Sequence, residues 1–203
     1  ARIPAPRASA SATFGAFEPR RFAFGLAAYF MFGLGYIGYM TFAVTLLRER
    51  AMSSDAVFVF FTLLGIGVMV SPFLWARLLQ HHRDGRPLAV LSLLLALATA
   101  LPVAWDRPLA SYASAAIFGG VFLSVVASTT ALVRHNLPAA QWAAGVSAFT
   151  IVFAVGQIIG PSVVGVLADV TGGLHAGLGA SAGALLAGAA LATRQRSLRS
   201  TVG

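Results

Sequence analysis

The sequence predicts an all-α integral membrane protein with six transmembrane helices, and three observations support this fold class. First, 58% of the 203 residues are hydrophobic and 10% are charged, whereas soluble domains average roughly 25% charged residues. Second, the apolar residues gather into six runs of about 18 to 27 residues, and a helix needs about 20 residues to cross a bilayer. Third, the runs are continuous rather than alternating, which favours helices over barrel strands.

The residues that bound these runs are typical of helix ends. The runs cover residues 22–47, 56–76, 88–105, 108–133, 142–168 and 174–193. Ser53 and Asp55 precede the second run, where their side chains can cap a helix N-terminus. Pro87 and Pro108 suit the first turns of the third and fourth helices. Asp, Glu and Arg occur only at the ends of the runs, so most of each run can lie in hydrocarbon.

The distribution of arginine predicts the orientation. All 14 basic residues are arginines, and Arg48, Arg50 and Arg107 lie on one side of the predicted membrane. The other 11 lie on the opposite side, so the positive-inside rule places both termini in the cytoplasm. We therefore expect three segments: a flexible cytoplasmic linker over 1–20, a six-helix bundle over 21–194 and a cytoplasmic tail over 195–203.

Glycines inside the apolar runs predict close helix packing. The stretch GQIIGPSVVGVLAD, residues 156–169, places Gly156, Gly160 and Gly165 in one run, and Gly179 and Gly183 form a similar pair in the last run. Lipid tails are as apolar as leucine, so membrane helices associate through close backbone approach and interhelical hydrogen bonds. Each of these glycines is a candidate contact for a neighbouring helix.

Two prolines predict bends in the runs that hold them. Pro161 lies in the fifth run and Pro72 in the second, and a proline inside a helix frees a backbone carbonyl one turn earlier. Close, bent helices fit a protein that changes shape. The same features also occur in ordinary packing of membrane helices, and the residues alone leave both interpretations open.

Polar side chains inside the runs are the candidate substrate contacts. Tyr29, Tyr36 and Tyr39 fall within an arc of about 80° at 100° per residue. Tyrosine offers a flat apolar surface and one hydroxyl, which suits an organic solute. Further candidates are Ser128, Thr130 and Gln157. The alternative is that these groups bond a neighbouring helix or their own backbone.

Several functions are disfavoured by what the sequence lacks. The chain has no cysteine, and its apolar runs hold neither a serine with a partner histidine nor paired aspartates, so we expect no enzyme activity. The arginines form no patch interleaved with aromatic residues, so we expect no nucleic-acid partner. We expect no cofactor and no metal site.

Two motifs resemble the major facilitator superfamily. Residues 156–165, GQIIGPSVVG, resemble the family's G-x-x-x-G-P-x-x-G-G pattern, with Val164 in place of the first paired glycine. The connector LLQHHRDGRPL resembles the loop pattern G-x-x-x-D-R-x-G-R, in which Arg83, Gly85 and Arg86 match. Leu78 and His82 stand where that pattern has glycine and aspartate. With Asp84, the three matching residues are the candidate cytoplasmic gate loop.

Longer phrases resemble the bacterial YbfB/YjiJ-type group of this superfamily. They are GYIGYMTFAVTLLRE, AAGVSAFTIVFAVGQIIGPSVVGVLAD and GGLHAGLGASAGALLAGAALA. The resemblance implies the C-terminal half, helices seven to twelve, of a twelve-helix transporter in the bacterial inner membrane. It implies that the first and fourth helices line a cavity, while the second and fifth form a moving seam.

The resemblance also implies the partners. They are the lipid bilayer, an N-terminal six-helix half and a small organic solute moved by alternating access. No Asp, Glu or His lies deep in a run, so in a proton-coupled transporter the coupling group would lie in the other half. Two alternatives stay open: a membrane scaffold that transports nothing, and a six-helix half-transporter that works as a dimer.

Overall fold

The computed structural model describes residues 17–171 and 173–198 of the chain, and these residues form an all-α bundle. The long helices are α1 (Ala23–Glu49), α2 (Ser54–His81), α3 (Arg86–Ala104), α4 (Pro108–Asn136), α5 (Trp142–Thr171) and α6 (Leu174–Thr193). Short 3-10 helices, η1 (Pro19–Phe22) and η2 (Ala139–Gln141), precede α1 and α5. All six long helices are long and apolar enough to cross a membrane, which confirms the predicted fold class.

Parts of the two predicted terminal segments lie outside the described residues. These parts are residues 1–16 of the linker and 199–203 of the tail. Each predicted run corresponds to one helix, and several helices extend a turn or more beyond it. α2, for example, continues to His81 through Arg77 and Gln80, whose side chains are exposed. Apolar content marks the part of a helix that can lie in hydrocarbon, not the full length of the helix.

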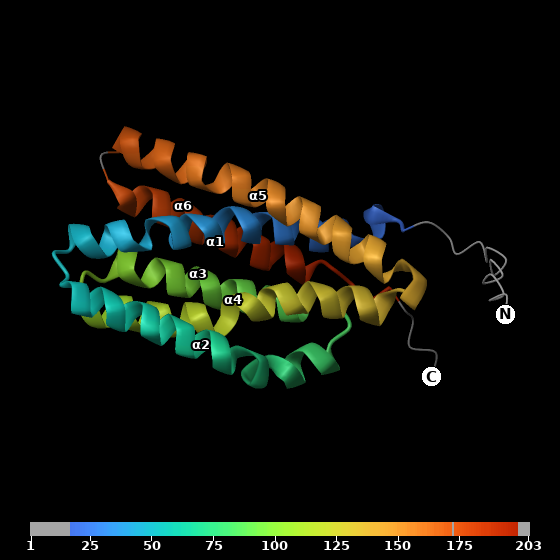
Figure 1. Cartoon of the computed structure of the whole chain (residues 1–203). Coiled ribbons are helices and arrows are strands. Elements are labelled where there is room, and N and C mark those ends of the chain that lie inside the picture. The colour runs from blue at the N-terminus through green and yellow to red at the C-terminus, as the bar shows by residue number, and fades with distance from the viewer. Residues whose placement is uncertain (1–16, 172, 199–203) are drawn as a thin grey trace, which may run out of the picture.

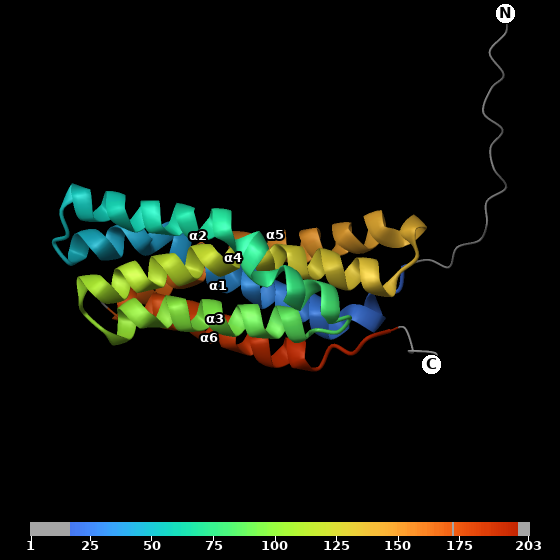
Figure 2. The same ribbon diagram turned by 90° about the horizontal axis from the view of Figure 1, so that it is seen from below.

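The helices pack in an arc whose order differs from their order in the chain. Contacts run from α5 to α1, then to α6, α3, α4 and α2. α2 and α5 therefore lie at opposite edges of the view in Figure 1. In Figure 2, α5 and the first part of α2 lie along one side of the bundle and α3 and α6 along the other, and the later part of α2 crosses toward the middle.

Most described arginines gather at one end of the bundle, which we call the arginine-rich end. There α1 begins, α2 ends, α3 begins, α4 ends, α5 begins and α6 ends (Figure 1). Its arginines are Arg20, Arg21, Arg77, Arg83, Arg86, Arg134, Arg194 and Arg196. The opposite end holds Arg48, Arg50 and Arg107 together with four carboxylates, Glu49, Asp55, Asp106 and Asp169.

α2 and α5 expose far more apolar surface than the other helices. In the most apolar window of each, 11% of α2 and 17% of α5 is buried, against 44% to 56% for the other four helices. Phe73 of α2 is 84% exposed and Ile158 of α5 is 76% exposed. Lipid can cover such surface, and so can another protein in the membrane.

α1 and α5 approach closely because glycines face the opposing backbone. A methyl group added to Gly156 would lie 2.6 Å from the carbonyl oxygen of Phe30. One added to Gly160 would lie 2.6 Å from the carbonyl oxygen of Leu34. Real side chains do not approach backbone atoms this closely. Residues larger than glycine at these two positions would force α1 and α5 apart.

The other predicted glycines do not make such contacts within the described part of the chain. Methyl groups added to Gly165, Gly179 or Gly183 would meet no atom within 4 Å. In α6 the close contacts belong instead to Gly177, against Val164 of α5, and Gly188, against Ala28 of α1. The predicted contact pair of α6, Gly179 and Gly183, was therefore wrong within this bundle. A spacing of four residues puts two glycines on the same face of a helix, but it does not show which face packs against a neighbour.

Both predicted prolines lie inside continuous helices. Pro72 is in α2 and Pro161 in α5, and Figure 1 shows α2 changing direction along its length. Beside Pro72, the Ser71 and Ser124 hydroxyls lie 2.7 Å apart in a hydrogen bond between α2 and α4. Trp75 donates its indole N–H to the Gly120 carbonyl over 2.7 Å. These bonds hold α2 against α4 where its own backbone bonding is interrupted.

Replacing Gly160 by leucine is expected to destabilise the bundle. Gly160→Leu puts a large side chain against the backbone of α1, and overpacking typically costs about 1 to 3 kcal/mol. Gly165→Leu is the matched control, because it makes the same change in the same helix toward open space. Thermal unfolding in detergent should show a lower midpoint for Gly160→Leu alone. Equal midpoints for the two variants would contradict the α1–α5 contact.

Candidate functional site

Aromatic rings from α1, α4 and α5 meet in one cluster. This aromatic cluster consists of Tyr29, Phe32 and Tyr36 of α1, Phe122 of α4, and Phe149 and Phe153 of α5. Phe153 stacks on all three α1 rings, with centroids 5.0 to 5.6 Å apart. The rings give this part of α1 and α5 an apolar surface with few rotatable bonds.

Tyr36 and Gln157 are the two candidate residues that the structure joins directly. The Gln157 side-chain amide donates to the Tyr36 hydroxyl over 2.9 Å, from α5 to α1. Tyr36 also stacks between Phe32 and Phe122, whose ring centroids lie 5.0 and 6.1 Å away. Both residues are half-buried. They can therefore bond each other and still present polar atoms at the edge of the cluster.

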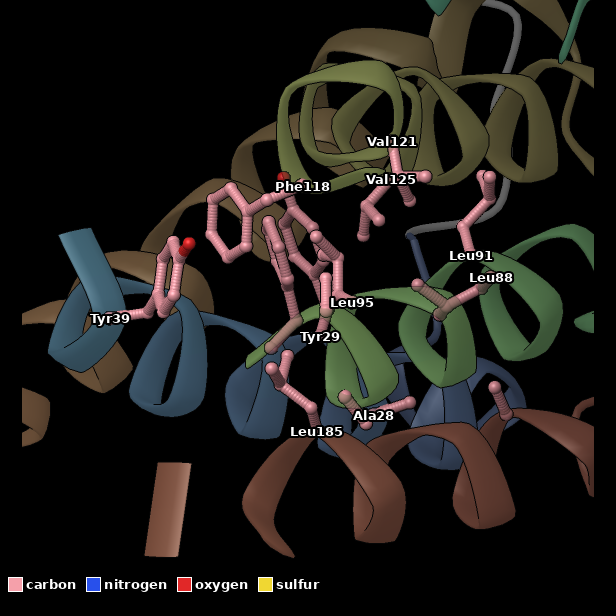
Figure 3. Packing of buried hydrophobic residues seen from close by; sticks show 14 of the residues in the cluster. Ala28, Tyr29, Tyr39, Leu88, Leu91, Leu95, Phe118, Val121, Val125 and Leu185 are labelled. Atoms are coloured by element: carbon pink, nitrogen blue, oxygen red, sulfur yellow. The ribbon is translucent and has the colours of Figure 1, made fainter. Parts of the chain in front are cut away.

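Tyr39 and Tyr29 lie in the core. Tyr39 is 1% exposed, and its hydroxyl is 2.6 Å from that of Ser114 in α4. Ser114 in turn donates to the Ala98 carbonyl of α3 over 2.6 Å. Figure 3 shows the ring of Tyr39 facing Phe118, 4.3 Å away. The predicted tyrosine stripe is thus divided between a half-buried member, Tyr36, and two buried ones.

Of the two hydroxyl candidates in α4, Ser128 is buried and Thr130 is half-buried. Ser128 is buried and donates to the Val125 carbonyl of its own helix over 2.7 Å. Thr130 lines a pocket of about 650 Å³ at the arginine-rich end, between α2, α4 and the start of α5. Its other lining residues include Gln80, Arg134, His135 and Trp142. Thr130 and this pocket mark an opening beside α4.

The predicted gate loop is held by contacts with the start of α3 and with the segment after α6. Asp84 accepts from the Arg86 backbone N–H over 3.1 Å and pairs with the Arg86 guanidinium over 3.3 Å, at the start of α3. Gly85 is buried and donates its N–H to the Gln195 carbonyl over 2.9 Å. A methyl group at Gly85 would collide with the Ala192 carbonyl. Glycine is needed here so that the loop can lie against the end of α6.

Asn136, at the end of α4, joins the gate loop to the segment after α6. Its side-chain amide donates to the Arg83 carbonyl over 2.7 Å, and its side-chain oxygen accepts from the Leu198 N–H over 2.6 Å. Gln195, 4% exposed, adds bonds to the start of α1. Sequence reasoning missed both amides, because a polar residue at the end of an apolar run is usually solvated. No signal in the pattern distinguished them.

Arg50 is a third residue that the sequence did not single out. Its side chain is 9% exposed at the end of α1, and its guanidinium pairs with Asp106 over 2.9 Å. It also donates to the Ser111 hydroxyl over 3.1 Å and to the Pro102 carbonyl. This arginine joins α1 to both helices of the α3–α4 pair. In the sequence, Arg50 served only to predict the membrane orientation. Its position at a helix end does not reveal that its side chain is buried.

Six apolar helices and polar groups paired across helix interfaces define a multi-pass membrane protein. The family comparison narrows this class: residues 2–193 match the family model described as "Uncharacterised MFS-type transporter YbfB". The chain therefore belongs to the YbfB-type family of major facilitator superfamily transporters, as its motifs had indicated. A search of curated proteins and a search of solved structures gave no match.

Removing the Asn136 side-chain amide should loosen the gate loop. Asn136→Leu removes two part-buried hydrogen bonds, to the Arg83 carbonyl and from the Leu198 N–H, each of which contributes about 0.5 to 1.5 kcal/mol. We expect a lower unfolding midpoint and faster trypsin cleavage after Arg83. Gln80→Leu, at an exposed amide of α2, is the control and should change neither. Unchanged cleavage in Asn136→Leu would show that the amide does not hold the loop.

Proposed function

We propose that this protein is a secondary active transporter of a small organic solute that works by alternating access. The observation that carries the proposal is the Tyr36–Gln157 hydrogen bond at the edge of the aromatic cluster, in a chain of a transporter family. Facilitators bind substrate near the bilayer midplane, between parts that move against each other. Tyr36 and Gln157 lie well inside α1 and α5, away from the helix ends, which is the depth at which such a site is expected.

The aromatic cluster favours a solute with an apolar or planar body and at least one polar group. Such a solute can stack on Phe122 or Phe153 and take the place of one partner in the Tyr36–Gln157 bond. Exchanging one hydrogen bond for another keeps the buried polar groups satisfied in both states. Thr130, beside the pocket at the arginine-rich end, lies on the route by which the solute would leave or enter.

The exposed faces of α2 and α5 fit a second six-helix half packed against them. These two helices carry large exposed residues, including Phe58 and Phe73 in α2 and Ile151 and Ile158 in α5. They lie at the two ends of the arc of packed helices. Rocking of two halves around a central site requires this kind of interface. The partner that we propose is the N-terminal half of a twelve-helix transporter.

We assign the arginine-rich end to the cytoplasmic side of a bacterial inner membrane. Eight described arginines lie at this end and three at the other, and the positive-inside rule supports this direction. Both Glu18 and Asp84 lie at the arginine-rich end, and the remaining four carboxylates lie at the opposite end. In a proton-coupled mechanism, a titrating group within the membrane would therefore come from the partner half.

Transport assays on the complete protein test this function. A panel of radiolabelled organic solutes would be screened in proteoliposomes, followed by Tyr36→Phe on the solute that is moved. Loss of the hydroxyl should weaken binding about two- to tenfold, since one hydrogen bond contributes about 0.5 to 1.5 kcal/mol. Tyr112→Phe removes a hydroxyl from α4 outside the cluster and should leave transport unchanged.

Two results would count against the proposal. Equal transport by Tyr36→Phe and wild type would remove Tyr36 from the solute path. Absence of transport of every solute in the panel, with a correctly folded and reconstituted protein, would favour the scaffold alternative.

A further inference from the structure

We propose that the arginine-rich end carries a binding site for the phosphate group of an anionic phospholipid. The site is a pocket of about 450 Å³ between the start of α1 and the end of α6. Four arginines line it: Arg20 and Arg21 from η1, and Arg194 and Arg196 from the segment after α6. The proposal is independent of the transport function, because it concerns the outside of the bundle and needs no transported solute.

Within the described residues, no acidic side chain pairs with the arginines of this pocket. All six acidic residues of the sequence lie in the described part, and the ion pairs found there are Arg50–Asp106 and Arg86–Asp84. The four pocket arginines are exposed and form no ion pair in the described residues. Guanidinium groups are weakly hydrated and match phosphate oxygens in pairs. An anion is therefore the ligand that this pocket fits.

Gln195 holds the two arginine pairs together. Its side-chain amide donates to the carbonyl of Arg21 over 3.2 Å and to that of Arg196 over 3.0 Å. Its side-chain oxygen accepts from the Gly25 N–H over 3.0 Å. Residues more than 170 positions apart in the sequence are thus joined through one buried side chain. The arginines project from a fixed backbone frame, which reduces the entropy lost on binding.

The surroundings favour a lipid over a soluble phosphate. Phe24, 44% exposed, and Leu198 line the same pocket, so apolar surface continues from the arginines. The pocket lies at one end of two candidate membrane spans, Pro19–Glu49 and Leu174–Thr193, so we expect it at the depth of the headgroups. Basic pockets between membrane helices are known to take anionic lipid headgroups. Acyl chains would lie along Phe24 while the phosphate lies among the guanidiniums.

The test is a lipid titration of the purified complete protein in dodecyl maltoside, read by native mass spectrometry. The probes are dioleoylphosphatidylglycerol, dioleoylglycerol with the same chains but no phosphate, and glycerol 3-phosphate with no chains. We expect binding of the phosphatidylglycerol, none of the dioleoylglycerol, and no displacement by millimolar glycerol 3-phosphate. Displacement by glycerol 3-phosphate would identify a soluble phosphate as the ligand and overturn the lipid proposal, and so would binding of dioleoylglycerol.

Two double variants assign the binding to this pocket. Arg20→Gln/Arg194→Gln removes one arginine from each pair and should weaken phosphatidylglycerol binding about tenfold or more. Arg77→Gln/Arg83→Gln removes the same charge from the same end outside the pocket and should weaken it less than about threefold. Equal weakening of phosphatidylglycerol binding in both double variants would show that net charge alone accounts for the binding, and it would overturn the proposed site. Because the four substituted arginines are exposed, neither double variant disturbs the core.

Discussion

Glycine contacts between helix backbones hold this bundle together. Lipid tails are as apolar as the helix surfaces, so the hydrophobic effect does not drive membrane helices to associate. The packing of α1 depends most on these glycine contacts. Its Gly33 faces the Phe153 carbonyl of α5, and its Gly35 faces the Ser181 carbonyl of α6, each at 2.6 Å from an added methyl group. From α5, Gly156 and Gly160 complete the first of these contacts. The position of α1 between α5 and α6 therefore rests on the absence of side chains.

This close packing determines where polar groups can be used for binding. Tyr39 and Ser114 are buried between helices and are already paired, as are Ser71 and Ser124. Such pairs fix one helix to the next. The pair Tyr36 and Gln157 differs because both residues are half-buried and lie beside the half-buried rings of Phe122 and Phe153. A bound solute can compete for this pair without opening the core, which is why it is the centre of the proposed site.

Helix positions could be predicted because membrane thickness sets a minimum length for each apolar run. Which face of a helix is covered could not, since nearly every face is apolar: the spacing of Gly179 and Gly183 matched that of a contact pair, yet Gly177 and Gly188 make the contacts. Motif resemblance predicted the family, and the family match confirmed it. Tyr36 and Gln157 were found by their polarity within apolar runs. Asn136, Gln195 and Arg50 were missed because their burial depends on loops that fold back over helix ends.

The most direct test of the central packing contact uses the absence of cysteine from the chain. The Gln157 amide of α5 bonds the Tyr36 hydroxyl of α1 over 2.9 Å, so cysteines at these two positions can be bridged by a short bifunctional thiol reagent without touching a contact glycine. We would introduce Tyr36→Cys with Gln157→Cys, and Tyr36→Cys with Ile158→Cys for comparison, because Ile158 is 76% exposed, and treat both with the reagent in membranes. The packing described here predicts an intramolecular cross-link for the first pair and little or none for the second. Equal cross-linking of the two pairs, or cross-linking of the second alone, would contradict it.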